Sequence, residues 1–240
     1  MFENKRVGAL LLMAGVGKRL GGEIPKQYLP LAGMPVYLHT LQSFLNVGFF
    51  DEILLVCLAD WIPQVKMETA RHWPLVRPIA GGPTRQASSF AGLCAFSSPP
   101  DLVVIHDAVR PFVSEAILHE NVCGASNYGA VDTCIPSADT LVYAPKKPQV
   151  TDIPKRADFL RGQTPQSFRF DWICRAHEAA LQAKFEATDD CKLVLDLGLD
   201  VFVVPGSETN IKITTHFDFL VAEQILKSAA NPASGTCAKA

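Results

Sequence analysis

An apolar run near the start of the chain breaks abruptly into a glycine-rich, basic loop, between residues 10 and 28. Residues 7–13 carry no polar side chain, which is typical of a strand buried on both faces of a sheet. Gly15 and Gly17 then let the backbone turn at little steric cost, and backbone N–H groups in such loops can hold anionic oxygens. Three cations lie in or beside the loop: Lys18, Arg19 and Lys26. The stretch therefore predicts a polyphosphate-binding loop.

Two common phosphate motifs do not describe this loop. The Walker motif needs Ser or Thr after Gly-Lys, but Arg19 follows Gly17-Lys18. The dinucleotide motif needs G-x-G-x-x-G, whereas Gly15, Gly17 and Gly21 are spaced G-x-G-x-x-x-G. On this segment alone, a plain strand-to-helix turn with solvated lysines remains an alternative.

Apolar β-type runs alternate with helix-like stretches along the chain, which is typical of a parallel sheet covered on both faces. The predicted strands are 7–13, 52–58, 75–79, 101–106, 130–135 and 201–204, and a short extended piece is predicted at 210–213. The predicted helices are 35–46, 62–72, 84–96, 115–127 with Ser114 as cap, 171–183, 189–197 and 216–227. The pattern predicts an α/β fold with one Rossmann-like, mostly parallel sheet.

One nucleotide-binding-type domain is expected over residues 1–228. Within it, residues 136–156 carry two short β-like runs around the turn APKKPQ, which cannot cross a buried sheet. We interpret them as a protruding β-hairpin arm, too short to bury its own core and therefore stabilised by a second copy in a homodimer. Residues 229–240 are small and polar, and are expected to be disordered.

Composition limits the binding partners and the cellular location that the protein is expected to have. The formal net charge of −2 argues against a general nucleic-acid binder. No apolar run reaches the length that spans a membrane. Seven cysteines form no C-x-x-C pair and leave an odd one over, which favours reduced thiols in the cytoplasm.

Polar residues follow several predicted strands, at the edge where open α/β sheets bind ligands. The strand that ends at residue 79 is followed by Gly81, Gly82, Arg85 and Ser88. The strand that ends at His106 is followed by Asp107 and Arg110. Asp107 could bind Mg²⁺ or a substrate hydroxyl, or could form a structural pair with Arg110. His106 has apolar neighbours and is interpreted as structural.

Two further blocks lie towards the C-terminus. Thr188 with the next two carboxylates forms either part of the site or a helix cap. Lys212 stands between two isoleucines, so strand alternation points it away from their side chains. An inward lysine there would need an anionic partner.

The loop pattern A-G-x-G-x-R followed by Pro-Lys resembles nucleotidyltransferases that join a nucleoside triphosphate to a phosphorylated sugar or polyol. Further blocks narrow the resemblance to the 2-C-methyl-D-erythritol 4-phosphate cytidylyltransferase family. They are PKQYL (25–29), GGxxRxxS (81–88), HDAxRP (106–111), Asp139-Thr140, QTPQxF (163–168), TDD (188–190) and NIKIT (210–214). They come in family order and span residues 7 to about 226.

The resemblance implies a reaction of CTP with a polyol phosphate, with Mg²⁺ as cofactor. It implies that Arg19, Lys26 and Lys212 are catalytic cations. The implied nucleotide contacts are Ala14, Gly15, Val16, Gly17, Lys18, Gly81, Gly82 and Ser88. The implied substrate contacts are Arg156, Lys212, Asp107 and Thr140. From their place in the sequence we add Arg110 and Thr188 as substrate contacts, and Asp107 as the candidate metal ligand. In the family the arm completes the partner's site, so Thr140 and Arg156 are expected to serve the neighbouring chain.

The chain departs from the family pattern at three positions. Pro83 replaces an acid that can reach the ribose, and Met13 and Val109 are bulkier than the usual residues. Two alternatives stay open: a ribitol 5-phosphate cytidylyltransferase, which shares the loop, and a non-catalytic nucleotide-binding regulator. The intact TDD and NIKIT blocks favour the isoprenoid family, and the retained cations disfavour a regulator.

Overall fold

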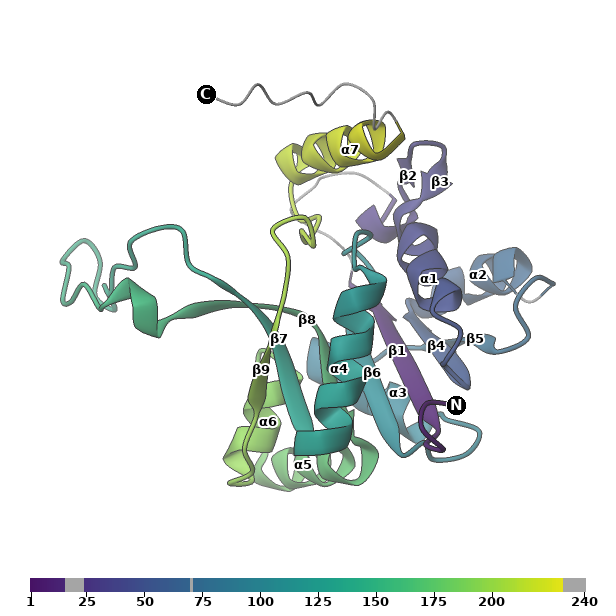
Figure 1. Ribbon diagram of the computed structural model, residues 1–240, viewed down its shortest axis with the longest axis horizontal. Coiled ribbons are helices and arrows are strands. Elements are labelled where there is room, and N and C mark those ends of the chain that lie inside the picture. Colours follow the sequence, from purple (N-terminus) through teal and green to yellow (C-terminus); the bar gives the residue numbers. More distant parts are fainter. Residues whose placement is uncertain (16–23, 70, 231–240) are drawn as a thin grey trace.

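The computed structural model describes residues 1–15, 24–69 and 71–230 of the 240-residue chain. At its centre lies a seven-stranded sheet with the order β5-β4-β1-β6-β8-β7-β9 (Figure 1). The strands are β1 (Val7–Met13), β4 (Glu52–Cys57), β5 (Val76–Ala80), β6 (Leu102–Asp107), β7 (Ala130–Pro136), β8 (Leu160–Arg169) and β9 (Phe202–Pro205). A separate hairpin consists of β2 (Pro30–Leu31) and β3 (Met34–Pro35).

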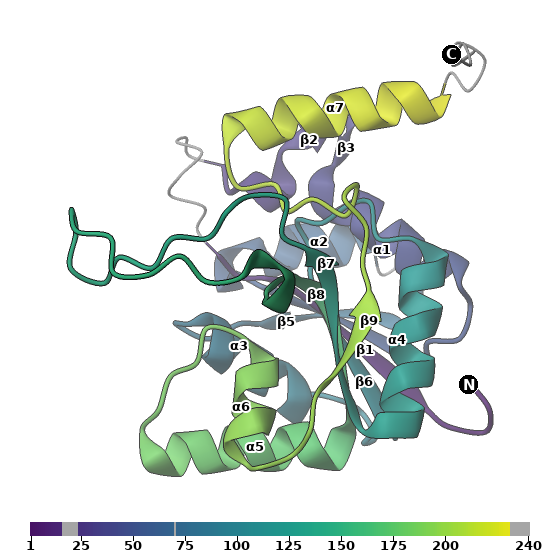
Figure 2. The same ribbon diagram turned by 60° about the vertical axis from the view of Figure 1, so that its left-hand side comes forward.

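The sheet is mostly parallel, which confirms the predicted fold class. β5, β4, β1 and β6 run parallel to one another, and β9 runs parallel to β7. Only β8 opposes its neighbours, β6 and β7. Parallel strands require crossover helices, and these cover the sheet on both faces (Figure 2).

Each face of the sheet has its own apolar core, because successive side chains of β1 point to opposite faces. Leu11 and Met13 join one core, and Leu10 and Leu12 join the other. The first core is covered by α1 (Val36–Asn46), α2 (Ile62–Thr69) and α4 (Glu115–Tyr128). The second is covered by α3 (Arg85–Cys94), α5 (Phe170–Ala183) and α6 (Asp190–Asp196). α7 (His216–Ala230) lies across the β2–β3 hairpin at one end of the molecule (Figure 2).

The strand order creates a switch point beside β1. From β1 the chain proceeds to β4 and β5 on one side, and then returns through α3 to β6 on the other side. Ligands bind at such points in open α/β sheets. The register pairs Leu12 with Asp107, so the residues that begin the glycine-rich loop, Ala14 and Gly15, follow β1 at the edge of the sheet where Asp107 ends β6.

The sequence analysis does not predict β8. Its sequence, LRGQTPQSFR, has neither an apolar run nor a clean alternation, and it contains a proline. Residues 163–168 are nevertheless buried, and their polar side chains find partners inside the protein. Gln166 donates to Asp132 Oδ1 (2.9 Å), and Ser167 donates to Asn121 Oδ1 (3.0 Å). Because buried hydrogen bonds replace apolar packing, hydrophobic periodicity misses this strand.

The arm between β7 and residue 156 protrudes from the body of the molecule, as predicted (Figure 1). Its two predicted β-like runs are reduced to one isolated bridge between Tyr143 and Asp152, in which Tyr143 N–H donates to Asp152 O (2.8 Å). Within the described residues, the arm therefore contains no strand of its own.

The other boundaries agree closely with the sequence analysis, apart from the C-terminus. α7 continues to Ala230, so residues 229 and 230 belong to this helix and not to a disordered tail. The rest of the predicted tail, 231–240, lies outside the described residues. The predicted extended piece at 210–213 forms no strand. None of the helices in the described part of the chain is long and apolar enough to span a membrane.

Candidate active site

A cavity of about 540 Å³ opens at the switch point. Ala14 and Gly15 line it from the end of β1, and Lys26 lines it from the turn that follows the loop. Gly82 and Arg85 approach from β5 and α3. The remaining polar side chains on its wall are Gln27, Thr84, Ser88, Asp107, Lys212 and Thr214. Segments that are far apart in the sequence thus meet at the carboxyl ends of the strands, where the sequence predicts a ligand site.

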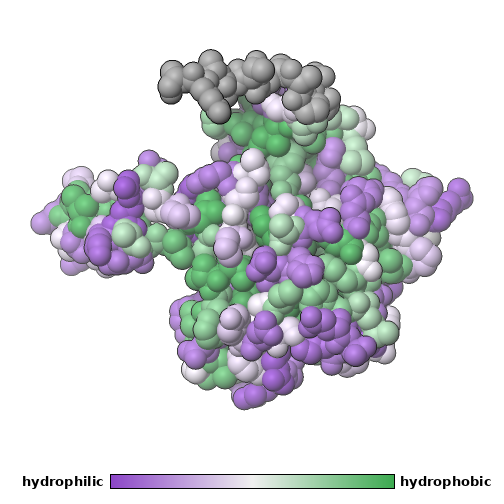
Figure 3. All heavy atoms as spheres, in the orientation of Figure 1, coloured by the Kyte–Doolittle hydropathy of each residue, from purple (hydrophilic) through white to green (hydrophobic). Residues whose placement is uncertain are grey.

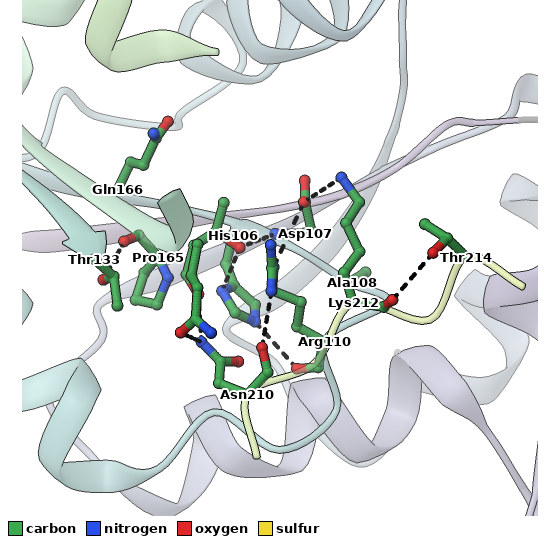
Figure 4. A network of polar contacts seen from close by, with 12 residues as sticks. His106, Asp107, Ala108, Arg110, Thr133, Pro165, Gln166, Asn210, Lys212 and Thr214 are labelled. Carbon is green, nitrogen blue, oxygen red and sulfur yellow. Dashed lines mark hydrogen bonds and ion pairs between the residues drawn. The ribbon is translucent and has the colours of Figure 1, made fainter. Parts of the chain in front are cut away.

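Asp107 lies among three cations, two of which, Lys212 and Arg110, are labelled in Figure 4. Its Oδ2 is 2.7 Å from Lys212 Nζ and 3.8 Å from Arg110 Nε, and its Oδ1 is 3.8 Å from Arg85 Nε. Burial alone raises the pKa of the Asp107 carboxyl, but Lys212, followed by Arg85 and Arg110, outweighs burial and holds this pKa well below its usual range. The carboxylate is therefore charged at neutral pH.

Lys212 reaches Asp107 because the segment around it is fixed at several points. Asn210 donates to Thr164 O (2.9 Å), and its own carbonyl accepts from Arg110 Nη1 (2.8 Å). Ile213 is fully buried and its N–H donates to Val109 O (2.9 Å). Lys212 thus reaches an anionic partner while its neighbour Ile213 is buried, although the segment forms no strand.

Lys26 and Gln27 hold the entrance of the glycine-rich loop. Lys26 Nζ donates to Ile213 O (2.7 Å), which links the loop to the C-terminal segment. Gln27 is buried and its Nε2 donates to both Met13 O (2.7 Å) and Gly15 O (2.9 Å). The sequence analysis overlooks Gln27, although it stands within the PKQYL block. One amide thus fixes the point where β1 becomes the loop.

Gly82 and Ser88 form the opposite wall. Ser88 Oγ accepts from Gly82 N–H (3.1 Å) and donates to Thr84 O (2.8 Å), so its hydroxyl orders the turn into α3. Thr84 caps α3 by accepting from Ala87 N–H (3.1 Å). A Cβ on Gly82 would lie 2.6 Å from the Ala87 Cβ, so this tight turn needs glycine. Gly81 lies behind the wall, where a Cβ would meet that of Ala14 at 2.4 Å.

Asp190 is a functional candidate that the sequence analysis does not separate from a helix cap. The cap is Asp189, which accepts from Lys192 N–H (2.9 Å). Asp190 is fully buried instead, and accepts from Arg85 Nη1 (2.7 Å). Burial raises the pKa of Asp190, but Arg85 and then His177 outweigh it, so this pKa is lowered. The sequence does contain a signal for Asp190. One helix needs only one capping side chain, but the TDD block supplies two carboxylates, so the second is available for another role.

Besides Gly81, which lies behind the wall, four predicted site residues do not line the cavity in this chain. Thr140 and Arg156 are exposed on the arm, and Arg156 Nη1 donates to Ala138 O (2.9 Å). Thr188 is exposed, and Arg110 is buried behind Asp107. Four other implied residues lie outside the described part of the chain: Val16, Gly17, Lys18 and Arg19.

The donor set does not suit a metal held by the protein alone. Among the described residues, no three His, Cys, Asp or Glu side chains are grouped closely enough to hold a metal ion. A cation on Asp107 would also compete with Lys212 for Oδ2. Mg²⁺ would therefore need oxygens of a substrate phosphate and of water as most of its ligands, as it commonly does.

Comparisons with known proteins show the class of enzyme to which the chain belongs. The chain is 41% identical over 228 residues to a 2-C-methyl-D-erythritol 4-phosphate cytidylyltransferase from Geotalea uraniireducens, covering 93% of this chain and 97% of that one. It is 36% identical over 228 residues to a ribitol-5-phosphate cytidylyltransferase from Lactiplantibacillus plantarum, covering 91% and 97%. The chain is thus a nucleotidyltransferase, and more narrowly a cytidylyltransferase.

The family follows from its model and from solved structures. The model described as 2-C-methyl-D-erythritol 4-phosphate cytidylyltransferase matches residues 7–228, so the chain belongs to this family. A crystal structure of 4-diphosphocytidyl-2C-methyl-D-erythritol synthase from Anaerococcus prevotii superposes with a TM-score of 0.84, at 32% identity over 93% of this chain and 99% of that chain. The 2-C-methyl-D-erythritol 4-phosphate cytidylyltransferase from Thermus thermophilus gives 0.75, at 30% identity over 91% and 98%.

His106 is structural, as the sequence analysis interprets it. The ring is fully buried, with Nδ1 3.0 Å from Thr164 Oγ1 and Nε2 3.2 Å from Arg110 O. Burial lowers the pKa of His106 to about 4. Its imidazole is therefore neutral at neutral pH, and both of its ring nitrogens are already occupied.

We predict that His106 makes the protein sensitive to mild acid. The unfolded chain takes up this proton below about pH 6.5, and the folded chain only below about 4, so stability falls as pH drops through that window. The difference corresponds to about 3 kcal/mol of unfolding free energy between pH 7 and pH 4. Urea unfolding of wild type and His106→Gln at both pH values should show the wild type losing more stability by this amount. Parallel losses would contradict the buried neutral imidazole.

Proposed function

We propose that the protein joins CTP and 2-C-methyl-D-erythritol 4-phosphate, giving 4-diphosphocytidyl-2-C-methyl-D-erythritol and pyrophosphate. One observation carries the proposal: Asp107 is paired with Lys212 on the wall of a cavity that is also lined by Lys26 and by the start of the glycine-rich loop. This arrangement suits a substrate that has both hydroxyl and phosphate groups, next to a nucleotide. The Geotalea relative, at 41% identity, carries that activity in its name.

In this reaction an oxygen of the polyol phosphate attacks the α-phosphorus of CTP. The bond from that phosphorus to the bridging oxygen breaks, and pyrophosphate leaves. The nucleophile is already an anion, so no base is required and charge stabilisation dominates. We assign this task to Lys26 and Lys212, which line the cavity, and to Arg19.

On the nucleotide side, we assign the phosphates to the loop and the base to the opposite wall. The loop residues are Ala14, Gly15, Val16, Gly17 and Lys18. Gly82 and Ser88 offer main-chain groups beside a fixed turn, and Gly81 supports that turn from behind. Pro83 also lines the cavity, and its side chain has no polar group with which to bind a ribose.

We also propose Mg²⁺ as the cofactor, arriving with the triphosphate. It would neutralise part of the phosphate charge, and Asp107 is the one acid among the described residues that line the cavity. The cytoplasmic location, and the absence of nucleic-acid or membrane partners, stay predictions.

The ribitol 5-phosphate reaction is a second candidate, because the Lactiplantibacillus relative is 36% identical over nearly the same length. Both alcohols are phosphorylated polyols and would use the same cations. The two reactions would differ only in the residues that surround the carbon chain of the polyol.

One assay tests the proposal directly. We expect the purified protein to release pyrophosphate from CTP with 2-C-methyl-D-erythritol 4-phosphate at a kcat/KM at least about tenfold higher than with D-ribitol 5-phosphate. UTP should be a poor substitute, because a wall that hydrogen-bonds cytosine leaves polar groups unpaired against uracil. Preference for ribitol phosphate would establish the second candidate, and no release with either alcohol would leave a nucleotide-binding regulator.

We further propose that the arm forms a homodimer and completes the partner's site. Figure 3 shows the arm standing apart from the body, with apolar side chains on its surface. Its large exposed apolar residues are Val142, Tyr143, Val150 and Ile153. Such residues favour burial against another chain. Thr140 and Arg156 would then bind substrate in the neighbouring subunit, which is consistent with their distance from the cavity lining of their own chain.

Subunit mixing tests the shared site. Arg156→Ala and Lys26→Ala proteins should each be nearly inactive. After co-refolding, a mixed dimer has one site with both residues intact, so under random pairing about a quarter of all sites should recover. No recovery, with subunit exchange verified by differently tagged chains, would mean that Arg156 acts within its own chain.

A further inference from the structure

A buried pair of ionisable residues lies behind the cavity wall, where the proposed chemistry does not use it. His177 of α5 is 1% exposed, and its Nε2 is 2.9 Å from Asp190 Oδ1. Asp190 in turn binds Arg85, which lines the cavity and faces Asp107. His177, Asp190, Arg85 and Asp107 therefore form one continuous row from the core to the cavity.

We propose that His177 and Asp190 are positioning residues, which fix the guanidinium of Arg85 and through it the carboxylate of Asp107. Arg85 is held from two sides: Nη1 is 2.7 Å from Asp190 Oδ2, and Nε is 3.8 Å from Asp107 Oδ1. The shorter of the two contacts is the one to Asp190. Asp190 thus keeps Arg85 from turning fully towards Asp107, where it would compete with Lys212, or towards incoming phosphates.

Asp190 is suited to this task because it is itself immobilised. It is the first residue of α6, and its N–H donates to Gln166 Oε1 (3.3 Å). Gln166 is anchored by its donation to Asp132 Oδ1 (2.9 Å). The acid therefore joins α3, α5, α6 and β8, and a carboxylate placed in this way cannot follow Arg85 if the arginine moves.

His177 occupies one carboxylate oxygen of Asp190 and so leaves the other oxygen to Arg85. Its Nε2 is 2.9 Å from Oδ1, which leaves Oδ2 to Arg85. The other ring nitrogen, Nδ1, finds no partner among the described residues, so the imidazole is buried with only one of its two polar atoms satisfied. An apolar side chain would fill the space more cheaply. The contact with Asp190 accounts for the presence of a histidine at this position.

Phe90 provides a matched control for simple packing loss. Its ring stacks on His177, with centroids 5.6 Å apart and an interplanar angle of 11°. Phe90→Leu removes packing around the imidazole and leaves the contact with Asp190 available. His177→Phe keeps a ring in place but removes the polar atom, whereas His177→Gln restores a donor near the position of Nε2.

Two readouts test the proposal, and the first needs no substrate. The Nε–Hε signal of Arg85 in ¹⁵N–¹H spectra, assigned by its loss in Arg85→Lys, reports how firmly the guanidinium is held. We expect its solvent exchange to accelerate about tenfold in His177→Phe, and to stay near the wild-type rate in His177→Gln and Phe90→Leu. The second readout is kcat/KM for the polyol phosphate, which rests on the proposed function and should fall about tenfold in the same variant only.

The outcomes separate this proposal from the proposed function. If the wild type lacks the proposed turnover, the exchange rates still decide whether His177 holds Arg85. Equal effects in His177→Phe, His177→Gln and Phe90→Leu would reduce His177 to a packing residue and overturn the proposal. Should His177→Phe fail to fold, Asp190→Asn removes the charge at constant shape, and a wild-type Arg85 signal in that variant would overturn the proposal equally.

Discussion

The buried carboxylate of Asp107 is the constraint on which the rest of the site depends. A charge removed from water is tolerated only with close partners, and loss of one partner of a buried pair typically costs about 3–5 kcal/mol. Asp107 has three cationic neighbours, which come from the segment after β9, from α3 and from the turn after β6. Satisfying this one acid therefore brings together chain segments more than 100 residues apart.

The same arrangement resolves an electrostatic conflict at the site. A pocket for a nucleoside triphosphate and a polyol phosphate must contain cations, yet a polyol also needs a hydrogen-bond acceptor. Asp107 can act as that acceptor without repelling the phosphates, because Lys212, Arg85 and Arg110 already neutralise it. Asp190 then fixes the arginine that faces the cavity. Charge is thus arranged in alternating order from the core to the cavity.

Much of this could be predicted from local pattern. The apolar runs of β1 and β6, the glycines that follow, and the alternation of Lys212 with the buried Ile213 are all governed by neighbours in sequence. β8 could not be predicted in this way, because its buried side chains are polar and are satisfied by partners 34 to 46 residues away. Asp190 resembles a helix cap until the fold places Arg85 beside it. Thr140 and Arg156 have no visible role in a single chain, since their proposed site belongs to another subunit.

The most direct test of the account is the affinity of Asp107→Asn for pyrophosphate, measured by titration calorimetry without divalent metal. If Asp107 serves mainly to order and neutralise the cations, removal of its charge should tighten pyrophosphate binding by about tenfold while turnover falls by at least about a hundredfold. Unchanged or weaker pyrophosphate binding, or turnover close to wild type, would contradict the central place of this carboxylate.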